Sequence, residues 1–541
     1  MNRCRRDSST TQSVDEESAV NLDALENHPP GTVNLVSKLQ VAGTEGKVKL
    51  VPQPSGDPND PLGWPIWRKV CNFALLASMT TSIFSGLSMQ HLFWSRMKKE
   101  LHVDYTQLTR AKAAQLAAEA MACVVFIPFA KKYGRRPVYI ASTMLFTAAT
   151  WWSGYMTTVT ELFIIDIIKG FAGAVNETAV QMSIRDMFFV HQRGRANGFY
   201  LIALTTGISF SPLAAGAQAK AYGWRASFKT LAAVMTGITA LFFFLFEETK
   251  FVPAATLSTD HVYDKEAATS AEYSSGDSTL DLARQEPVKK ARYPRNMRLQ
   301  LVTPTNESLW RTLIEPLQAC RLPHVVIIGL LYGLGLGYVV MVGSMKSIIF
   351  PEAPYNFDPE QLGLLQLGPF VGSTLAGLYG GILSDKAIIW FAKRNKGIFE
   401  PEMRLYLLPL PVVLMSAGIA TFGITAGQGM HWIYPVIGST LTSFGFNSSA
   451  DLVLTVIIDA YPDIISQSFV IIAFLRNFLG MAGVLSLTPW RQNMGVIYMF
   501  VIIAVLAFTV NCLAIPLVIW GKKLRAKTAP RYYRMVRSES Q

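Results

Sequence analysis

Charged residues are scarce in this chain of 541 residues. Asp, Glu, Lys and Arg make up 16% of the sequence and hydrophobic residues make up 50%, whereas a soluble globular domain carries about 25% charged residues. This deficit excludes an ordinary cytosolic protein. A transmembrane helix needs about 20 apolar residues, so the length accommodates about twelve such helices and leaves about half of the chain for loops and tails.

Cysteine is also scarce and follows no pattern. The five cysteines are odd in number, scattered and mostly inside apolar runs, which argues against a disulfide framework and against metal-ligand spacing. We expect no metal and no cofactor. No polar segment carries a nucleophile, metal or phosphate-loop arrangement, so we expect no enzyme. The cysteines are Cys4, Cys71, Cys123, Cys320 and Cys512.

Residues 1–18 lack the apolar core of a signal peptide, so we expect the N-terminus to start in the cytosol. The net charge is +12, yet no basic stripe with interleaved aromatic residues stands on a soluble segment, which argues against nucleic acid as a partner. Cytosolic loops of membrane proteins carry an excess of Lys and Arg. We therefore attribute the basic balance to membrane topology.

Apolar runs long enough to span a bilayer form two sets of six. They predict an all-α membrane protein with twelve transmembrane helices in two pseudo-symmetric six-helix halves. The runs begin near Cys71, Lys112, Val138, Leu162, Ala196 and Ser227 in the first set, and near His324, Gln361, Leu405, Trp432, Ser466 and Gly495 in the second.

Polar segments flank and separate the two sets, and they are too rich in charge, Ser and Pro to bury a core. The end of the central segment, residues 307–321, is apolar at helical spacing, which predicts an amphipathic helix on the bilayer surface. The predicted parts are a disordered cytosolic tail (1–66), the first half (67–248), a cytosolic linker (249–322), the second half (323–521) and a basic cytosolic tail (522–541).

Lys and Arg gather in the loops after the second, fourth and eighth runs and after the last run. By the positive-inside rule these segments are cytosolic, and so are both termini. We expect a multi-pass protein of the cell membrane, in contact with the lipid bilayer, with the vacuolar membrane as the alternative location.

The loops after the second and eighth runs are both short and basic, which indicates an internal duplication. They read FIPFAKKYGRRPVYI and GGILSDKAIIWFAKRNKGIFEPEMRL. These strings resemble the pattern G-x-L-A-D-R-x-G-R-R-P that the major facilitator superfamily carries between helices 2 and 3, and the resemblance extends over residues 51–531. The retained positions are Lys132, Gly134, Arg135, Arg136 and Pro137 in the first loop, and Gly381, Ser384, Asp385 and Lys386 in the second.

The resemblance implies that these residues act in gating and conformational change. In the family, the Asp of this pattern takes part in a charge lock between helix ends that holds the outward-facing state. This chain has Lys131 at that position and Ile127 in place of the first Gly. The lock must therefore be rewired or weaker, and the acidic residues of the second loop are candidate partners.

The fifth run contains GISFSPLAAGA. Its Gly207, Pro212 and Gly216 resemble the G-x-x-x-G-P-x-x-G-G element of the family's antiporters, although Ser211 replaces the Gly before the proline. Glycine allows close helix approach and proline lets a helix bend. A packing face of small residues, common in membrane helices, is the equally weighted alternative.

Further strings narrow the resemblance to fungal twelve-span drug:proton antiporter-like efflux transporters, among them DPNDPLGWPIWRK, YGWRASF and FEETKF. The resemblance implies proton-coupled export of a small amphipathic organic compound, such as a secondary metabolite, toxin or drug, by a monomer. Uptake of a nutrient or organic cation by the same fold is the first alternative. A nutrient sensor that transports nothing is the second.

Charged residues inside the apolar runs need a reason, because each costs about 2.5–3.5 kcal/mol near the bilayer centre on insertion scales. Asp166 and Lys169 share one helix face by their spacing, and Glu177 follows in the same run. Glu119 lies mid-run among alanines. These four are the candidates for proton coupling, and we expect either Glu119 or Asp166 to be the carboxylate that carries the proton. The alternatives are a self-neutralised ion pair for the first two and a carboxylate hydrogen-bonded to a neighbouring helix for Glu119.

Polar and aromatic residues of the second half are candidates for the substrate cavity. Span 10 holds Asn447 and Asp451, and span 11 holds Arg476 and Asn477. We interpret these four first as a structural network across helices and second as cavity residues. The aromatic candidates are Tyr332 and Phe370.

Overall fold

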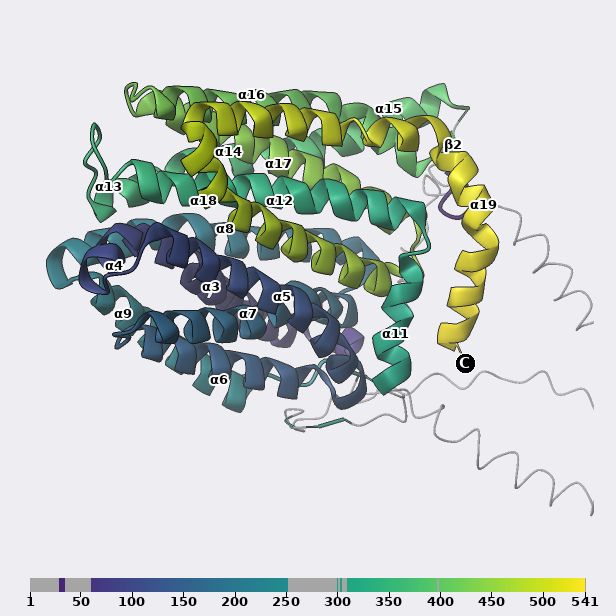
Figure 1. Ribbon diagram of the computed structural model, residues 1–541. Helices are drawn as coiled ribbons and strands as arrows, with labels where there is room; N and C mark the ends of the chain where they lie inside the picture. Colours follow the sequence, from purple (N-terminus) through teal and green to yellow (C-terminus); the bar gives the residue numbers. More distant parts are fainter. Residues whose placement is uncertain are drawn as a thin grey trace, which may run out of the picture.

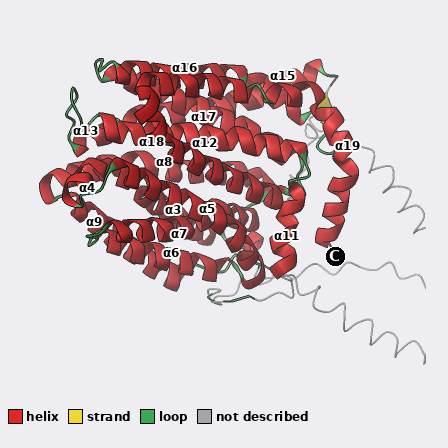
Figure 2. Cartoon of the chain, in the orientation of Figure 1, coloured by secondary structure: helices red, strands yellow, loops and turns green. Residues whose placement is uncertain are grey.

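The chain folds into two bundles of long helices that lie one above the other in Figures 1 and 2. Helices account for almost all of the part that can be described. The computed structural model describes residues 29–34, 60–251, 299, 302–303, 309–396 and 398–540.

The first bundle is the lower one in Figure 1, coloured purple to teal. Its helices are α3 (Ile66–Met89), α4 (Trp94–Glu100), α5 (Tyr105–Tyr133), α6 (Arg135–Ser153), α7 (Val159–Met187), α8 (Val190–Tyr222) and α9 (Trp224–Leu245), with the short η1 (Pro61–Gly63) and η2 (Gln90–Phe93).

The second bundle is interrupted more often, and a π-helical turn, η3, divides its second span. Its elements are α12 (Pro323–Ile349), α13 (Pro359–Leu364), α14 (Leu367–Gly377), η3 (Leu378–Leu383), α15 (Ser384–Arg394), η4 (Pro401–Leu407), α16 (Pro409–Gly427), α17 (Ile433–Ala460), α18 (Ile465–Asn511) and α19 (Ala514–Ser540), and α11 (Leu309–Ala319) precedes them.

Within the described residues, nine segments are long and apolar enough to cross a membrane. The last of them covers residues 467–536 and holds two crossings, because the backbone leaves the helical region at Gly495. Two further helices, α6 and α7, pack inside the first bundle against α9 and α5. They fall outside the nine because α6 is rich in Ser, Thr and Trp and α7 carries charged residues. The predicted fold class, six helices in each half, is confirmed.

The second span of each half begins with the same device. The side-chain oxygen of Gln107 accepts a hydrogen bond from the backbone N–H of Asp104 at 3.1 Å, and Gln361 accepts one from Asp358 at 3.0 Å. Each Asp side chain in turn caps the first helical turn. Such capping boxes satisfy backbone donors that a helix start leaves unpaired. Their equivalent positions support the predicted internal duplication.

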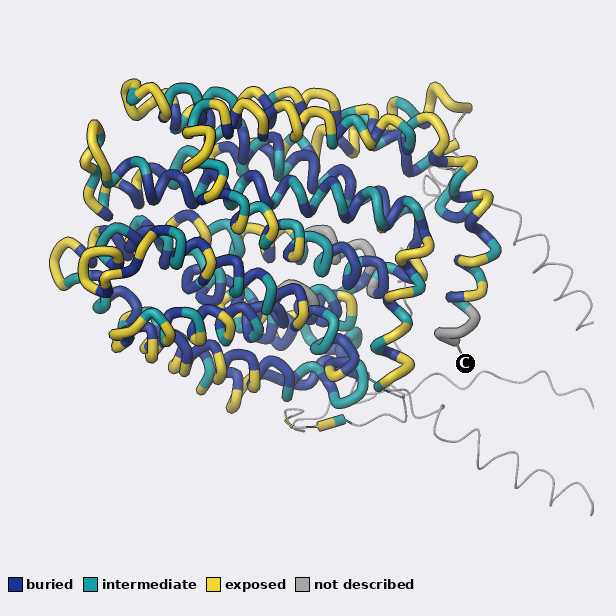
Figure 3. The backbone as a smooth tube through the Cα atoms, viewed as in Figure 1, coloured by how far each residue is buried: buried dark blue, intermediate teal, exposed yellow. Residues whose placement is uncertain are grey.

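Buried residues lie where helices face one another, and exposed residues lie on the outer sides of both bundles (Figure 3). Many exposed side chains are large and apolar, including Phe244 at 66% and Ile519 at 62%. So much exposed apolar surface is unusual for a protein that water surrounds. It suits helices that face lipid.

Glycine brings the two bundles together where α8 meets α13. A side-chain carbon added at Gly216 would lie 2.5 Å from the carbonyl oxygen of Pro359, and one at Gly363 would lie 2.7 Å from that of Pro212. Any larger residue would force these backbones apart. The bundles also meet along α5 and α18, where the hydroxyl oxygens of Thr109 and Thr488 are 3.0 Å apart.

The described N-terminal segment 29–34 and the C-terminal helix α19 lie at one end of the bundles, at the right in Figure 1, which we call the terminal end. There β1 (Val33–Asn34) pairs with β2 (Ile398–Phe399) in an antiparallel arrangement. Gly31 has a φ of +82°, and a side-chain carbon there would lie 2.4 Å from the carbonyl oxygen of Asp459. A short part of the predicted N-terminal tail is thus fitted closely to the second bundle.

A buried ion pair holds this contact in place. The Arg525 guanidinium, which is fully buried, donates to both carboxylate oxygens of Glu402 at 2.8 and 2.7 Å. It also donates to the carbonyl oxygen of Pro30 and to the hydroxyl of Thr32. Burial alone raises the pKa of Glu402, but its contacts with His324 and Arg525 outweigh burial and hold that pKa at about 2.

The substitution Glu402→Gln is expected to lower the free energy of unfolding by about 3 kcal/mol at pH 7, because it leaves the Arg525 charge buried without its partner. A melting curve of the purified protein in detergent measures the loss. The depressed pKa stabilises the fold above pH 4.5 and this contribution disappears as the pH falls toward 2. The difference between wild type and variant should therefore narrow over that range.

Glu400→Gln is the matched control, since the Glu400 pair with Lys522 is partly exposed, at 22% and 56% for the two side chains. Exposed pairs contribute about 0–1 kcal/mol. If Glu400→Gln destabilises the protein as much as Glu402→Gln does, the importance assigned to the buried pair is wrong.

Candidate functional site

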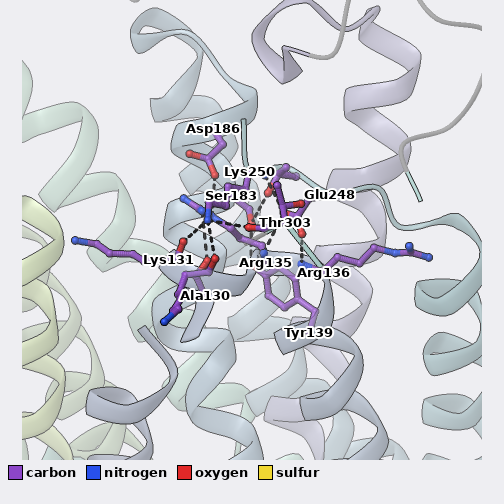
Figure 4. Close-up of polar contacts among 12 residues, drawn as sticks. Ala130, Lys131, Arg135, Arg136, Tyr139, Ser183, Asp186, Glu248, Lys250 and Thr303 are labelled. Atoms are coloured by element: carbon purple, nitrogen blue, oxygen red, sulfur yellow. Dashed lines mark hydrogen bonds and ion pairs between the residues drawn. The ribbon is translucent and has the colours of Figure 1, made fainter. Parts of the chain in front are cut away.

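The loop between α5 and α6, which carries the family pattern, is organised by a carboxylate from elsewhere in the half (Figure 4). Glu248, just after α9, accepts hydrogen bonds from the backbone N–H groups of Arg135 at 3.0 Å and Arg136 at 3.1 Å. A negative charge at a helix start is favourable, because the unpaired N–H groups there carry partial positive charge. Gly134 precedes this helix start with a φ of +108°, and a side-chain carbon there would lie 2.4 Å from the Glu248 carboxylate.

The arginines of this loop reach into the same bundle. Arg135 forms an ion pair with Asp186 of α7, with 3.0 Å between Nε and Oδ2. Arg136 donates to the carbonyl oxygens of Phe243 at 2.7 Å and of Leu299. Both contacts tie the start of α6 to neighbouring helices and to the linker.

A third contact to this loop comes from Lys250, which follows α9, whereas the side chain of Lys131 leaves the loop. Lys250 donates to the backbone carbonyl oxygens of Lys131 and, at 3.0 Å, of Lys132. The Lys131 side chain points away from this cluster in Figure 4, and its Nζ lies 4.0 Å from Glu315 of α11. Its partner is therefore in the linker helix. Pro137 lies in the first turn of α6, where its missing N–H has no helical partner to lose.

The second copy of the pattern has its own ion pairs. Arg404 of η4 lies 2.6 Å from Asp459 near the end of α17 and 3.5 Å from Asp385. The first pair is equivalent to the one between Arg135 and Asp186 in the first half. Gly381 has open space around its α-carbon, and Lys386 is exposed. The acidic residue of this copy thus has a partner within its own half, and Lys131 is paired elsewhere.

The predicted helix-5 element lies in the packed interior. A side-chain carbon at Gly207 would lie 2.4 Å from the carbonyl oxygen of Thr81 in α3. Pro212 and Gly216 meet α13 of the other half, as described above. Ser211, which replaces a family Gly, donates its hydroxyl back to the carbonyl oxygen of Gly207 at 2.7 Å.

Charged residues inside the first bundle form a cluster between α5 and α7. Gln115 donates to Glu119 at 2.9 Å, and Lys112 donates to Gln115 at 3.0 Å. Asp166 accepts a hydrogen bond from Gln90 at 2.9 Å. All of these side chains are buried.

Two buried lysines, Lys112 and Lys169, lie in the same bundle as these carboxylates. Lys112 acts electrostatically on both Glu119 and Asp166. Lys169 acts on Asp166 and lies 4.8 Å from the centre of the Phe228 ring. Asp166 and Lys169 are both buried on α7, whereas the side chain of Glu177 lies outside the described ones.

The sequence reasoning missed Lys112, Gln115 and Gln90. Lys112 and Gln115 lie seven and four positions before Glu119, which places all three on one helix face. This spacing was a usable signal. The hydrogen bond from Gln90 to Asp166 could not be found from spacing, because Gln90 lies in η2 and Asp166 lies in α7.

The cavity candidates of the second half make separate contacts. Arg476 donates to Asn477 at 3.1 Å and to the Tyr332 hydroxyl at 3.3 Å. Asn447 donates to Ser373 of α14 at 3.0 Å. These contacts join span 11 to span 7 and span 10 to span 8, in accord with a network across helices.

The remaining candidates lie at helix contacts. A side-chain carbon at Gly380 of η3 would lie 2.9 Å from the Asp451 carboxylate. The Phe370 ring packs edge to face on Phe210 of the other half, with 4.8 Å between centroids. A cavity of about 10 Å³ lies beside Tyr332, between helices of the second half. Neither the surroundings of Asp451, nor those of Phe370, nor this cavity is a substrate site by itself.

A duplicated bundle of twelve helices, with ionic contacts at helix ends and buried charges between helices, is the architecture of a secondary transporter. The family model of the Major Facilitator Superfamily matches residues 74–484. The chain belongs to this superfamily and is a membrane transporter.

Relatives match over most of their length. The chain is 27% identical to an uncharacterized MFS-type transporter, C1271.10c, of Schizosaccharomyces pombe, covering 93% of this chain and 94% of the relative. It is 23% identical to Protein HOL1 of Saccharomyces cerevisiae, covering 94% and 98%, and 26% identical to the MFS-type transporter penM of Penicillium rubens, covering 88% and 89%. A solved peptide transporter, a POT mutant in complex with sulfate, matches with a TM-score of 0.55 and 13% identity over 85% of this chain and 96% of that chain. That last likeness concerns the fold alone.

The substitution Gly134→Ala is expected to destabilise the protein by about 1–2 kcal/mol or more, because a left-handed backbone position disfavours a side chain and the new carbon meets the Glu248 carboxylate. The melting temperature in detergent measures this loss. Gly381→Ala is the matched control at the second copy of the pattern, where the space is open. Equal melting temperatures for the two variants would contradict the assigned role of Gly134.

Proposed function

We propose that this transporter exports a small amphipathic organic compound, such as a secondary metabolite, toxin or drug, across the plasma membrane in exchange for protons. It works as a monomer. The terminal end faces the cytosol, since its loops are basic. Substrate binds between the two halves, and rocking of the halves exposes it to one side of the membrane at a time.

The observation that carries this proposal is the buried cluster on α5 and α7. Its two carboxylates, Glu119 and Asp166, each accept a hydrogen bond from a glutamine, and both act on Lys112. Together with Lys169 the cluster contains two negative and two positive groups. Proton binding to one carboxylate leaves an excess positive charge in a medium where a charge is costly. That cost favours either release of the proton or a conformational change of the helices around it. In this way proton movement is coupled to the transport cycle.

The direction of transport rests on the helix-5 element. Gly207 and Gly216 bring α8 against α3 and against the other half, which suits a helix around which the halves rock. This supports the antiporter resemblance. The same contacts suit a packing face of small residues, so an experiment must separate export from uptake.

A deletion strain of the source organism is expected to be hypersensitive to the exported compound, and a toxicity screen of that strain identifies it. In everted vesicles, an acidic lumen should then drive the compound into the lumen, because protons leave as substrate enters. Accumulation only when the lumen is alkaline would instead establish proton-coupled uptake of a nutrient or organic cation. No movement under either gradient would contradict both.

The substitution Glu119→Gln is expected to remove the stimulation of transport by the pH gradient. Gln keeps the size and can still bond Gln115, but it cannot take up a proton, and Lys112 loses one of its counter-charges. Exchange of labelled for unlabelled substrate without a gradient should remain, and the gradient-driven rate should fall at least tenfold. Both rates are measured in the same vesicles.

Glu161→Gln is the control for this experiment. Glu161 is a carboxylate of the first turn of α7, bonded to Thr157 away from the cluster. It should leave gradient-driven transport unchanged. A normal gradient response in Glu119→Gln would remove Glu119 from the proton pathway.

A further inference from the structure

The seam between the two halves at the terminal end is covered by a helix that belongs to the linker. In Figure 1, α11 runs across the ends of the bundle helices. Thr312 and Pro316 of α11 lie together with Ile127 of α5 and with Gln467 and Val470 of α18 around one small pocket. The helix therefore touches both halves, the first through α5 and the second through α18.

One end of α11 is attached firmly to the second half. Ala319 and Leu322 are fully buried in the apolar core of that half, and α12 begins directly after them. As the halves rock, α11 must move with the second half. Its contact with α5 is then a contact that has to form and break.

The linker just before α11 is held by the first half. The backbone N–H of Thr303 donates to the carbonyl oxygen of Tyr133 at 2.8 Å, and its own carbonyl oxygen accepts from Lys250 at 3.1 Å. Leu299 accepts from Arg136. The described linker residues Leu299 and Thr303 are thus held by the first half, whereas the end of α11 is held by the second.

An ion pair joins α11 to α5 at the contact that has to form and break. The Lys131 ammonium lies 4.0 Å from the Glu315 carboxylate, and their side chains are 20% and 14% exposed. Glu315 is also 3.3 Å from Arg311 of its own helix, which holds the carboxylate on this face. Lys131 is the residue that stands where the superfamily pattern has an acidic residue.

We propose that α11 is a latch for the terminal side of the transporter. Glu315 pairs with Lys131 while that side is closed, and the pair breaks when α5 and α18 separate to open it. The reversed charge at position 131 is thereby matched by a carboxylate supplied from the linker. This inference rests on the alternating access of the proposed function, and it is independent of the substrate, the direction and the proton coupling.

Cys123 provides a reporter for the opening. Its side chain is buried on α5, and the Asn477 amide of α18 lies 4.0 Å from its sulfur. It reacts with a reagent from the terminal side only when these helices separate. The experiment uses the full chain with Cys4, Cys71, Cys320 and Cys512 replaced by Ser, in inside-out vesicles, and a membrane-impermeant maleimide.

Charge reversal by Lys131→Glu or by Glu315→Lys should each raise the labelling rate of Cys123 about fivefold, the factor that corresponds to about 1 kcal/mol for a partly exposed pair. The double variant restores opposite charges and should return the rate to within about twofold of the parent. Lys131→Met and Glu315→Gln should raise the rate less, and they replace the reversals if those fail to fold. Lys393→Glu, a reversal at an exposed site of α15, should leave the rate unchanged.

Three results would overturn the latch, and one of them would also contradict alternating access. Equal, measurable labelling in the parent and in every variant would show that the terminal side opens without regard to the ion pair. A complete absence of labelling in all of them would contradict alternating access as well. Raised labelling in the singles without recovery in the double variant would also refute a specific pair.

Discussion

A charge withdrawn from water needs an opposite charge nearby, and the way the helix ends meet in this protein depends on that constraint. Breaking a buried ion pair leaves an uncompensated charge at a cost of about 3–5 kcal/mol, whereas apolar faces gain little by leaving lipid for one another. Arg68 and Glu247 join the start of α3 to the end of α9 with two contacts, one of 2.6 Å. Arg525 and Glu402 do the same for α19 and η4.

The duplication of the fold extends to these pairs. Arg135 with Asp186 and Arg404 with Asp459 each join the entry of a third span to the last turn of a fourth, so that the two halves are fastened alike. The halves differ in what they hold inside. The first contains the buried charged cluster around Lys112, and the second presents a network of amides, hydroxyls and Arg476. The charged groups of the first half and the polar network of the second thus lie in separate bundles.

Some features of the site followed directly from the sequence. Asp166, Lys169 and Glu119 are buried, as their positions inside apolar runs predicted, and the repeated loops identified the superfamily. Their roles in proton coupling stay predictions. The partner of Lys131 was sought in the second loop, but among the described residues the carboxylate that pairs with it comes from α11. The contact of Glu248 with the loop at Gly134 was not predicted. The two residues are 114 positions apart in the sequence, and no local sequence pattern indicates a contact over such a separation.

The sequence by itself determined the number of spans, the duplication and the family, because membrane insertion demands long apolar runs and every run leaves a local record. Tertiary structure alone decided which charges share a partner. Asp166 and Lys131 acquire their partners Gln90 and Glu315 from helices that are far away along the chain. An ion pair depends on distances of a few ångströms between side chains, and these distances exist only after the helices have packed.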